Sequence, residues 1–230
     1  MKKNTILKDA LILTVITLIA GGLLGLVYEV TKKPIANQQE KAKQEAYKAV
    51  FEDADSFEVC VEAEDADLAE ALKEQGFEAQ KINEIMEAKD ASGETLGYAV
   101  NVTTSEGYGG DITFSMGVQL DGTLNGISIL SISETAGLGM NATKDEFKNQ
   151  FSDKNAEAFE VTKAGASDEN EINAISGATI TSKAVTGGVN AGICAFNYVK
   201  EVTYKSEPLS KKNYFSLTSP TLAPKRVTRS

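Results

Sequence analysis

The stretch Ser176-Gly177-Ala178-Thr179, called here the SGAT turn, has the residue types that an esterified phosphate requires. Gly177 and Ala178 remove side-chain bulk beside the Thr179 hydroxyl, and a helix that begins directly after it would favour a nearby phosphate. A Ser or Thr beside Gly and Ala is also the pattern of an ordinary N-terminal helix cap. Taken alone, the stretch therefore predicts a helix start, and a phosphate site is the alternative.

Two glycine-rich segments precede this stretch. The GYGG turn (residues 107–110) lies between two alternating segments, and the ETAGLG loop (residues 134–139) follows a strand-like segment that ends near Ser133. Glycines at such positions permit a backbone to approach a flat ligand closely. Each segment alone is typical of a turn, and neither has the glycine spacing of a dinucleotide fingerprint or a Walker loop. The three segments together are the candidate site.

Composition excludes several classes of function. The 230 residues contain no histidine, which excludes Ser-His-Asp hydrolysis and histidine-based metal sites. The formal charge of -10, with the arginines confined to Arg226 and Arg229, argues against nucleic-acid binding. Cys60 and Cys194 form no CxxC pair, so we expect unpaired or buried thiols rather than an iron–sulfur cluster, although a disulfide stays open. We predict no metal site and no catalytic residue.

The N-terminus predicts a membrane anchor. From Ala10 to Tyr28 no charged residue occurs, and at about 1.5 Å per residue this stretch nearly crosses a ~30 Å hydrocarbon layer. A cleaved signal peptide is the competing interpretation, but the apolar run exceeds the usual length of about 7 to 15 residues and no small-residue cleavage site follows it. The lysines on either side modestly favour a cytoplasmic N-terminus and an extracytoplasmic remainder at the cell membrane.

Hydropathy periods organise the rest of the chain. Residues 96–102 and 112–118 alternate in the manner of half-buried strands, and Asp121-Gly122 then predicts a hairpin. Thr143 with Glu146 predicts a capping box. We expect an α+β fold in which a single N-terminal transmembrane helix is followed by a largely antiparallel sheet and packed helices. Helical periods cover residues 37–51, 65–75 and 181–199.

These patterns divide the chain into five parts. The expected parts are a cytoplasmic N-terminus (1–9), a transmembrane helix (10–30), a membrane-proximal helical segment (31–90), a ligand-binding domain (91–200) and a disordered basic tail (201–230).

In their order and spacing, the three segments resemble a family: the G subunit of the Rnf complex and its relative, the C subunit of the sodium-pumping NADH:quinone oxidoreductase. The resemblance covers about residues 90–200 and the anchor. The matching residues are GYGGDI (107–112), ETAGLGMNATKDEFKNQF (134–151) and ISGATITS (175–182).

The resemblance implies an FMN-binding domain in which a phosphodiester bond joins the Thr179 oxygen to FMN. A separate FAD-dependent flavin transferase would install the flavin, and the redox chemistry would belong to the cofactor. One group of residues would line the phosphate end of FMN, and a second group would approach its ring or ribityl chain. The first group is Ser176, Gly177, Ala178 and Thr181, and the second is Glu134, Thr135, Gly137, Leu138 and Gly139.

The resemblance also implies an electron carrier within a membrane-bound, ion-translocating ferredoxin:NAD oxidoreductase, which is a translocase-type enzyme. Its partners would be the other Rnf subunits, above all the companion flavin-bearing membrane subunit, and the membrane. Two alternatives stay open. One is the C subunit of the quinone-reducing relative, and the other is a membrane-tethered flavin-binding or assembly module without a role in electron transfer.

Two residues depart from the family pattern. Asn173 stands where the flavinylation signal usually has Asp, three residues before Ser176, and Asn keeps the shape and one acceptor oxygen but loses the charge. A transferase that reads a carboxylate would therefore act more slowly on this chain. Ala136 stands where relatives often have Pro, which should affect the stiffness of the loop more than its chemistry.

Overall fold

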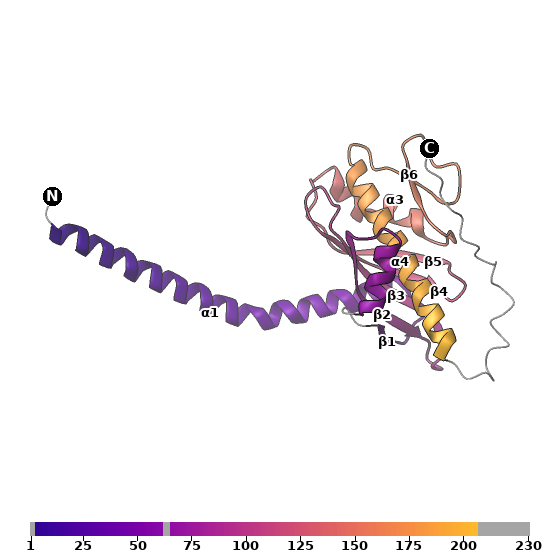
Figure 1. The fold of residues 1–230 in the computed structure, drawn as a ribbon, viewed down its shortest axis with the longest axis horizontal. Helices are drawn as coiled ribbons and strands as arrows, with labels where there is room; N and C mark the ends of the chain where they lie inside the picture. Colours follow the sequence, from indigo (N-terminus) through magenta and orange to yellow (C-terminus); the bar gives the residue numbers. More distant parts are fainter. Residues whose placement is uncertain (1–2, 62–64, 207–230) are drawn as a thin grey trace.

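The structure, a computed structural model, describes residues 3–61 and 65–206. One long helix leads into a domain built on a five-stranded antiparallel sheet of order β1-β2-β3-β4-β5 (Figure 1). The expected α+β class is confirmed. The elements are α1 (Lys3–Val50), β1 (Ser56–Val61), α2 (Ala66–Glu74), β2 (Gln80–Lys89), β3 (Thr95–Thr104), β4 (Ile112–Gln119), β5 (Leu124–Ser131), the 3-10 helix η1 (Gly139–Thr143), α3 (Asp145–Lys148), η2 (Asn149–Phe151), β6 (Glu160–Thr162), β7 (Glu171–Asn173) and α4 (Thr179–Ser206).

α1 is one helix that runs through Pro34 without a break. It contains a segment long and apolar enough to cross a membrane, and every residue from Lys8 to Val30 is exposed. The helix predicted for residues 37–51 is the direct continuation of this segment. Because a proline inside a helix removes one backbone hydrogen bond, it favours the change of direction that α1 shows along its length in Figure 1.

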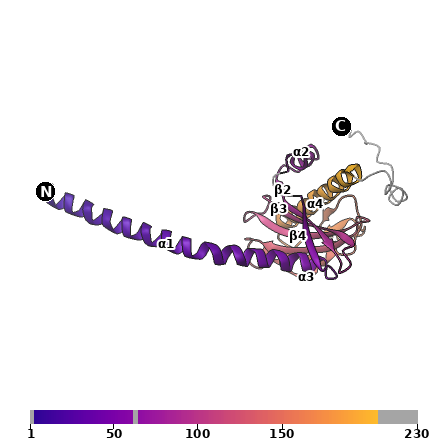
Figure 2. The same cartoon turned by 90° about the horizontal axis from the view of Figure 1, so that it is seen from below.

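The sheet is covered on both faces, although the sequence predicted half-buried strands. α4 packs on one face and forms the main core with residues such as Val102 and Phe114, while the C-terminal part of α1 packs on the other (Figure 2). Small residues make this second contact possible, because a Cβ at Gly117 would lie 2.7 Å from the Val50 carbonyl oxygen. The alternating small residues thus mark a close helix contact rather than a solvated face.

Several local expectations are settled by the structure. The hairpin after β4 is confirmed, and so is the helix expected at residues 65–75, which is α2. The strands β1 and β2 within residues 31–90 were not anticipated. The predicted capping box is wrong, because α3 begins after Lys144 and the Thr143 hydroxyl donates to the Met140 carbonyl, one turn back in η1. Both cysteines are free, and Cys60 is exposed. Residues 201–206 of the predicted tail belong to α4, and 207–230 lie outside the described residues.

A β-bulge in β2 ties α1 to the sheet. Asn83 is the extra residue between Ile82 and Glu84, and its side chain donates to Asn101 Oδ1 at 2.7 Å and Thr103 Oγ1 at 2.8 Å. Because a bulge directs two consecutive side chains to one face, Glu84 also faces α1.

Glu84 then makes the direct contacts with the helix. Its Oε1 accepts hydrogen bonds from Lys43 Nζ and Tyr47 OH, each at 2.6 Å. We call Lys43, Tyr47 and Glu84 the α1 clasp. Burial, together with the adjacent Glu84 carboxylate, raises the pKa of the Tyr47 hydroxyl above its ordinary value of 10.0. The pKa of Lys43 is also raised, because burial, which lowers it, is outweighed by the carboxylates of Glu84 and Glu40 together.

The clasp predicts how stability depends on pH. The unfolded chain loses the Tyr47 proton near pH 10 while the folded chain keeps it, so the free energy of unfolding should fall as the pH rises above about 10. Tyr47→Phe should lower the free energy of unfolding by about 1.5–3 kcal/mol at neutral pH, the contribution of a hydrogen bond to a charged group, and should make the alkaline decline shallower. Denaturant titrations followed by near-ultraviolet circular dichroism, in detergent, measure both effects.

Tyr108→Phe is the matched control, because Tyr108 is exposed and its hydroxyl makes no hydrogen bond to any described residue. An equal alkaline slope in the parent and in Tyr47→Phe would contradict this account of the clasp.

Candidate functional site

Thr179 is the first residue of α4, and the SGAT turn leads directly into it. The Ala178 N–H donates to the Ile175 carbonyl at 2.9 Å, and Gly177 has a φ of +74°, a conformation that favours glycine. Thr179 is half-buried, Ser176 and Gly177 are exposed, and the Thr179 hydroxyl makes no hydrogen bond to any described residue. Its oxygen therefore stands at the N-terminus of a long helix, where an added phosphate would be favoured.

Ser182 ties the SGAT turn to the first turn of α4. Its buried hydroxyl accepts a hydrogen bond from the Ile175 N–H at 2.9 Å and donates one to the Ala178 carbonyl at 3.0 Å. The hydroxyl therefore satisfies one donor and one acceptor of the turn. We did not single out Ser182 from the sequence. The signal that could have found it is its spacing of four residues from Ala178, at which a serine in a helix reaches the carbonyl one turn earlier.

The Glu134 side chain joins the three segments. Glu134 is only 9% exposed, and its Oε1 accepts a hydrogen bond from the Tyr108 N–H at 2.7 Å. Its other oxygen, Oε2, lies where the ETAGLG loop packs against α4, because a Cβ at Gly139 would lie 2.7 Å from Oε2 and 2.6 Å from Thr181 Oγ1. The GYGG turn, the ETAGLG loop and the start of α4 thus meet at one carboxylate.

Glycines allow the three segments to approach this closely. A Cβ at Gly109 would overlap the Ser133 carbonyl oxygen, and a Cβ at Gly177 would lie 3.0 Å from Leu138 Cδ2. Gly137 has open space around it but a φ of +78°, so its role is to let the ETAGLG loop turn. The Thr135 carbonyl stabilises the same loop by accepting the N–H groups of Leu138 and Met140.

Each of the three parts of the site has an exposed apolar side chain. Tyr108 is 73% exposed, Leu138 43% and Ile180 53%. Each comes from a different part of the site, namely the GYGG turn, the ETAGLG loop and the first turn of α4. Exposed apolar side chains on segments that meet at one site suit a flat aromatic ligand. Neither Tyr108 nor Ile180 was singled out from the sequence, because exposure depends on the tertiary structure.

Asn173 lies at the end of β7, apart from these contacts. Its Oδ1 accepts the Ala166 N–H at 2.7 Å, and its backbone N–H donates to Gln150 Oε1 at 2.7 Å. The side chain is exposed, so a protein that reads this position could reach it. An aspartate there would keep the acceptor oxygen that Ala166 uses.

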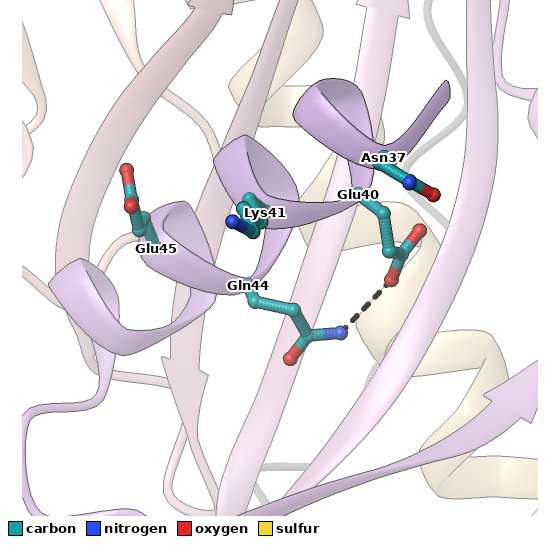
Figure 3. Close-up of a pocket in the computed structure, with 5 residues that line it drawn as sticks. All are labelled: Asn37, Glu40, Lys41, Gln44 and Glu45. Atoms are coloured by element: carbon teal, nitrogen blue, oxygen red, sulfur yellow. Dashed lines mark hydrogen bonds between the residues drawn. The ribbon is translucent and has the colours of Figure 1, made fainter. Parts of the chain in front are cut away.

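Two hollows lie beside α1 rather than at Thr179. A shallow one of about 490 Å³ follows polar residues on the surface of the helix, where Gln44 Nε2 donates to Glu40 Oε1 at 3.1 Å (Figure 3). A larger one of about 880 Å³ lies between residues 36–43 and the sheet, where Thr103, Thr113 and Ser131 line it. None of the lining residues comes from the three segments of the candidate site.

The position of the larger hollow indicates on which side of the domain the candidate site lies. Thr103 and Ser131 lie at the ends of β3 and β5 that lead into the GYGG turn and the ETAGLG loop, and residues 36–43 of α1 pass beside them. Val50 packs further along the sheet, at Gly117. α1 therefore leaves the domain on the side of the candidate site, and both views show the start of α4 on that side (Figures 1 and 2).

Comparison with known proteins agrees with these features. Residues 107–193 match the family described as FMN-binding domain, and residues 1–50 match the family described as RnfG N-terminal region. The G subunit of the proton-translocating ferredoxin:NAD(+) oxidoreductase complex of Clostridium ljungdahlii is 36% identical over 191 residues, which are 83% of this chain and 91% of that protein. Its Na(+)-translocating counterpart from Acetobacterium woodii is 37% identical over 194 residues, with the same coverage of each chain.

This chain belongs to the family of Rnf complex G subunits. It is therefore part of a membrane oxidoreductase complex and has an FMN-binding domain. Of the two related subunits that the sequence resembled, the Rnf protein is the one supported. Among solved structures, the C subunit of the Na(+)-translocating NADH-quinone reductase of Parabacteroides distasonis is similar, with a TM-score of 0.46, 22% identity and coverage of 64% of this chain and 77% of that chain.

The residues of this Rnf protein fit both ends of FMN. The phosphate end suits the Thr179 oxygen and the N–H groups of the first turn of α4, which have no partner within the helix. The ring end suits the glycine backbones and the apolar side chains of Tyr108, Leu138 and Ile180. Of the residues that the sequence assigned, Glu134, Leu138, Gly139, Gly177 and Thr181 are brought into contact across segments. Thr135 contributes through its backbone.

The contact at Gly139 yields a stability prediction for the Rnf protein. Gly139→Ala places a methyl group against Thr181 and Glu134, so it should lower the free energy of unfolding by about 1–3 kcal/mol. Urea unfolding followed by near-ultraviolet circular dichroism measures the change.

Gly187→Ala is the matched control within α4, because the nearest atom to its Cβ would be Glu106 Oε2 at 3.4 Å, an ordinary contact. This control should be neutral or gain up to about 1 kcal/mol from helix propensity. Equal urea-unfolding midpoints for Gly139→Ala and the parent would contradict the close contact of the ETAGLG loop with α4 at Gly139.

Proposed function

We propose that this Rnf protein holds FMN covalently on Thr179 and passes electrons within a membrane-bound, ion-translocating ferredoxin:NAD oxidoreductase. The observation that carries the proposal is the meeting of three glycine-containing segments around Glu134, beside a threonine at the start of α4. The names of the relatives from Clostridium ljungdahlii and Acetobacterium woodii support the ferredoxin:NAD assignment.

Attachment requires a reactive threonine oxygen and room for a phosphate. In the reaction we propose, Thr179 Oγ forms a bond to the flavin-side phosphorus of FAD, the pyrophosphate bond breaks, AMP leaves with the bonding electrons, and the hydroxyl proton is released. A separate flavin transferase would supply the catalytic groups, since among the described residues no side chain forms a hydrogen bond with the Thr179 hydroxyl. The chain itself contributes the position of the oxygen and the positive end of α4.

The bound flavin would supply the electron transfer, and the chain's residues would hold it. Ser176, Gly177, Ala178 and Thr181 would surround the phosphate end. The ETAGLG loop would lie along the ribityl chain and ring, where the exposed Leu138 side chain would contact the flavin. Electron exchange needs the flavin to reach a neighbour, and the exposed rim formed by Tyr108, Leu138 and Ile180 supports such an approach.

The membrane topology completes the proposal. Residues 1–9 would be cytoplasmic, residues 10–30 would span the membrane, and the domain of residues 91–200 would be extracytoplasmic. Because α1 leaves the domain on the side of the candidate site, the flavin would face the membrane and the companion flavin-bearing protein of the complex.

Covalent attachment predicts a fluorescent protein band. When the chain is coexpressed with a flavin transferase and separated on a denaturing gel, the parent should fluoresce and Thr179→Val should be dark, because valine keeps the shape but lacks the oxygen. Intact-mass spectrometry should give an increase of one FMN less one water for the parent.

Thr143→Ala is the control for this experiment, because it removes an exposed threonine hydroxyl in η1, away from the SGAT turn. If the parent shows no flavin fluorescence while the transferase labels a control protein, the covalent proposal is contradicted. That result would favour a tethered binding or assembly module. Fluorescence that survives in Thr179→Val would move the attachment to another residue, such as Ser176 or Thr181.

The family departure at Asn173 predicts incomplete labelling. Asn173→Asp restores the carboxylate that a transferase would read, and the fold should be kept because aspartate retains the acceptor used by the Ala166 N–H. The labelled fraction after a short reaction should therefore rise above that of the parent, as measured by the ratio of flavin to protein absorbance. An unchanged fraction would show that the charge at this position has no role in labelling.

A further inference from the structure

The structural role of Glu134 does not explain why this buried residue is a carboxylate. Among the described residues it is the only Asp or Glu whose side chain is buried, and no Lys forms an ion pair with it. A buried charge without an ionic partner is costly, so its retention calls for a reason.

The Tyr108 contact does not require a charge. A neutral amide oxygen would accept the same N–H, so glutamine would hold the GYGG turn equally well. The second oxygen, Oε2, makes no hydrogen bond to any described residue and lies beside Gly139 and Thr181. The charge thus lies where the ETAGLG loop packs against the start of α4, and no described lysine pairs with it.

We propose that the Glu134 carboxylate lowers the reduction potential of the flavin held at this site. The inference rests on the proposed function, because it requires FMN to lie at the start of α4, beside the ETAGLG loop. Reduction adds negative charge to the flavin ring, and a fixed carboxylate close to the ring opposes that charge. The opposition is strong here because burial keeps water from screening the carboxylate. A charge near the ring is one of the means by which a protein sets a flavin potential.

An exposed carboxylate nearby provides the contrast. Glu106 directly precedes the GYGG turn and accepts a hydrogen bond from Gln80 Nε2 at 2.6 Å. Its side chain is exposed, so water and salt screen its charge. The two glutamates lie in neighbouring parts of the site and differ in burial, which makes the same substitution at both positions a matched pair.

The experiment uses the full chain, labelled by coexpression with a flavin transferase and held in detergent. Spectroelectrochemical titration compares the parent with Glu134→Gln and Glu106→Gln. At a fixed ambient potential, Glu134→Gln should raise the ratio of reduced to oxidised flavin at least tenfold, which is about 59 mV for a one-electron step. Glu106→Gln should change this ratio by much less.

Further variants separate charge from structure. Glu134→Asp keeps the charge but has a shorter side chain, which places the carboxylate farther from the Tyr108 N–H. The flavin potential of this variant should therefore be closer to that of the parent than the flavin potential of Glu134→Gln is. Should the glutamine variant not accumulate, Glu134→Met removes the charge together with the acceptor of the Tyr108 N–H, and Glu134→Asp is then the control for the altered contact.

Each outcome decides the inference. Equal potentials in a labelled parent and a labelled charge-free variant overturn the role of Glu134 and leave covalent FMN standing. A shift in Glu134→Asp as large as in Glu134→Gln assigns the effect to geometry and also overturns the inference. A parent without flavin overturns the proposed function, and this inference falls with it.

Discussion

The ETAGLG loop approaches the first turn of α4 so closely that no side chain fits at position 139. This single approach places Glu134 beside Thr181 and brings Leu138 against Gly177. The same carboxylate holds the GYGG turn through the Tyr108 N–H. A larger residue at position 139 would separate the loop from α4, and the three segments would no longer meet. The cost of the arrangement is a buried carboxylate and several glycines, which add little to stability themselves.

A second constraint connects the candidate site to the candidate membrane span. α1 is one helix from the candidate membrane span to Val50, and its last turns pack on the sheet through Gly117 and the α1 clasp. The bulge at Asn83 is what allows Glu84 to face the helix. Because the span and the domain share a helix, the position of the candidate site relative to the span depends on the bend of α1 and on the clasp. The proposed electron exchange with a neighbouring subunit would benefit from such a defined position.

Local patterns predicted much of this fold. The alternation in β3 and β4, the Asp121-Gly122 hairpin and the helical period after Thr179 are set by neighbouring residues, so the sequence alone was sufficient for them. The burial of both sheet faces was missed because it depends on α1, whose contact is distant in sequence. β1 and β2 were missed for a related reason, since bulges interrupt the alternation of both strands.

The site was predictable only in part. Each glycine segment alone is an ordinary turn, and it was their order, as a family resemblance, that grouped them. The roles of Ser182 and Tyr108 and the orientation of Glu134 follow from the tertiary contacts. The predicted capping box is wrong because residues 139–143 form a 3-10 helix. Within this helix the Thr143 hydroxyl donates a hydrogen bond to the Met140 carbonyl. Sequence periodicity gives no information on that choice.

The central claim is that the start of α4 holds the flavin, and peptide mapping tests it most directly. Trypsin cleaves after Lys163 and Lys183, so one peptide, residues 164–183, contains the whole SGAT turn. After coexpression with a flavin transferase, the account predicts that this peptide alone is fluorescent and that fragmentation in the mass spectrometer locates the FMN on Thr179. Flavin on any other peptide, or a labelled peptide 164–183 whose modified residue is not Thr179, would contradict it.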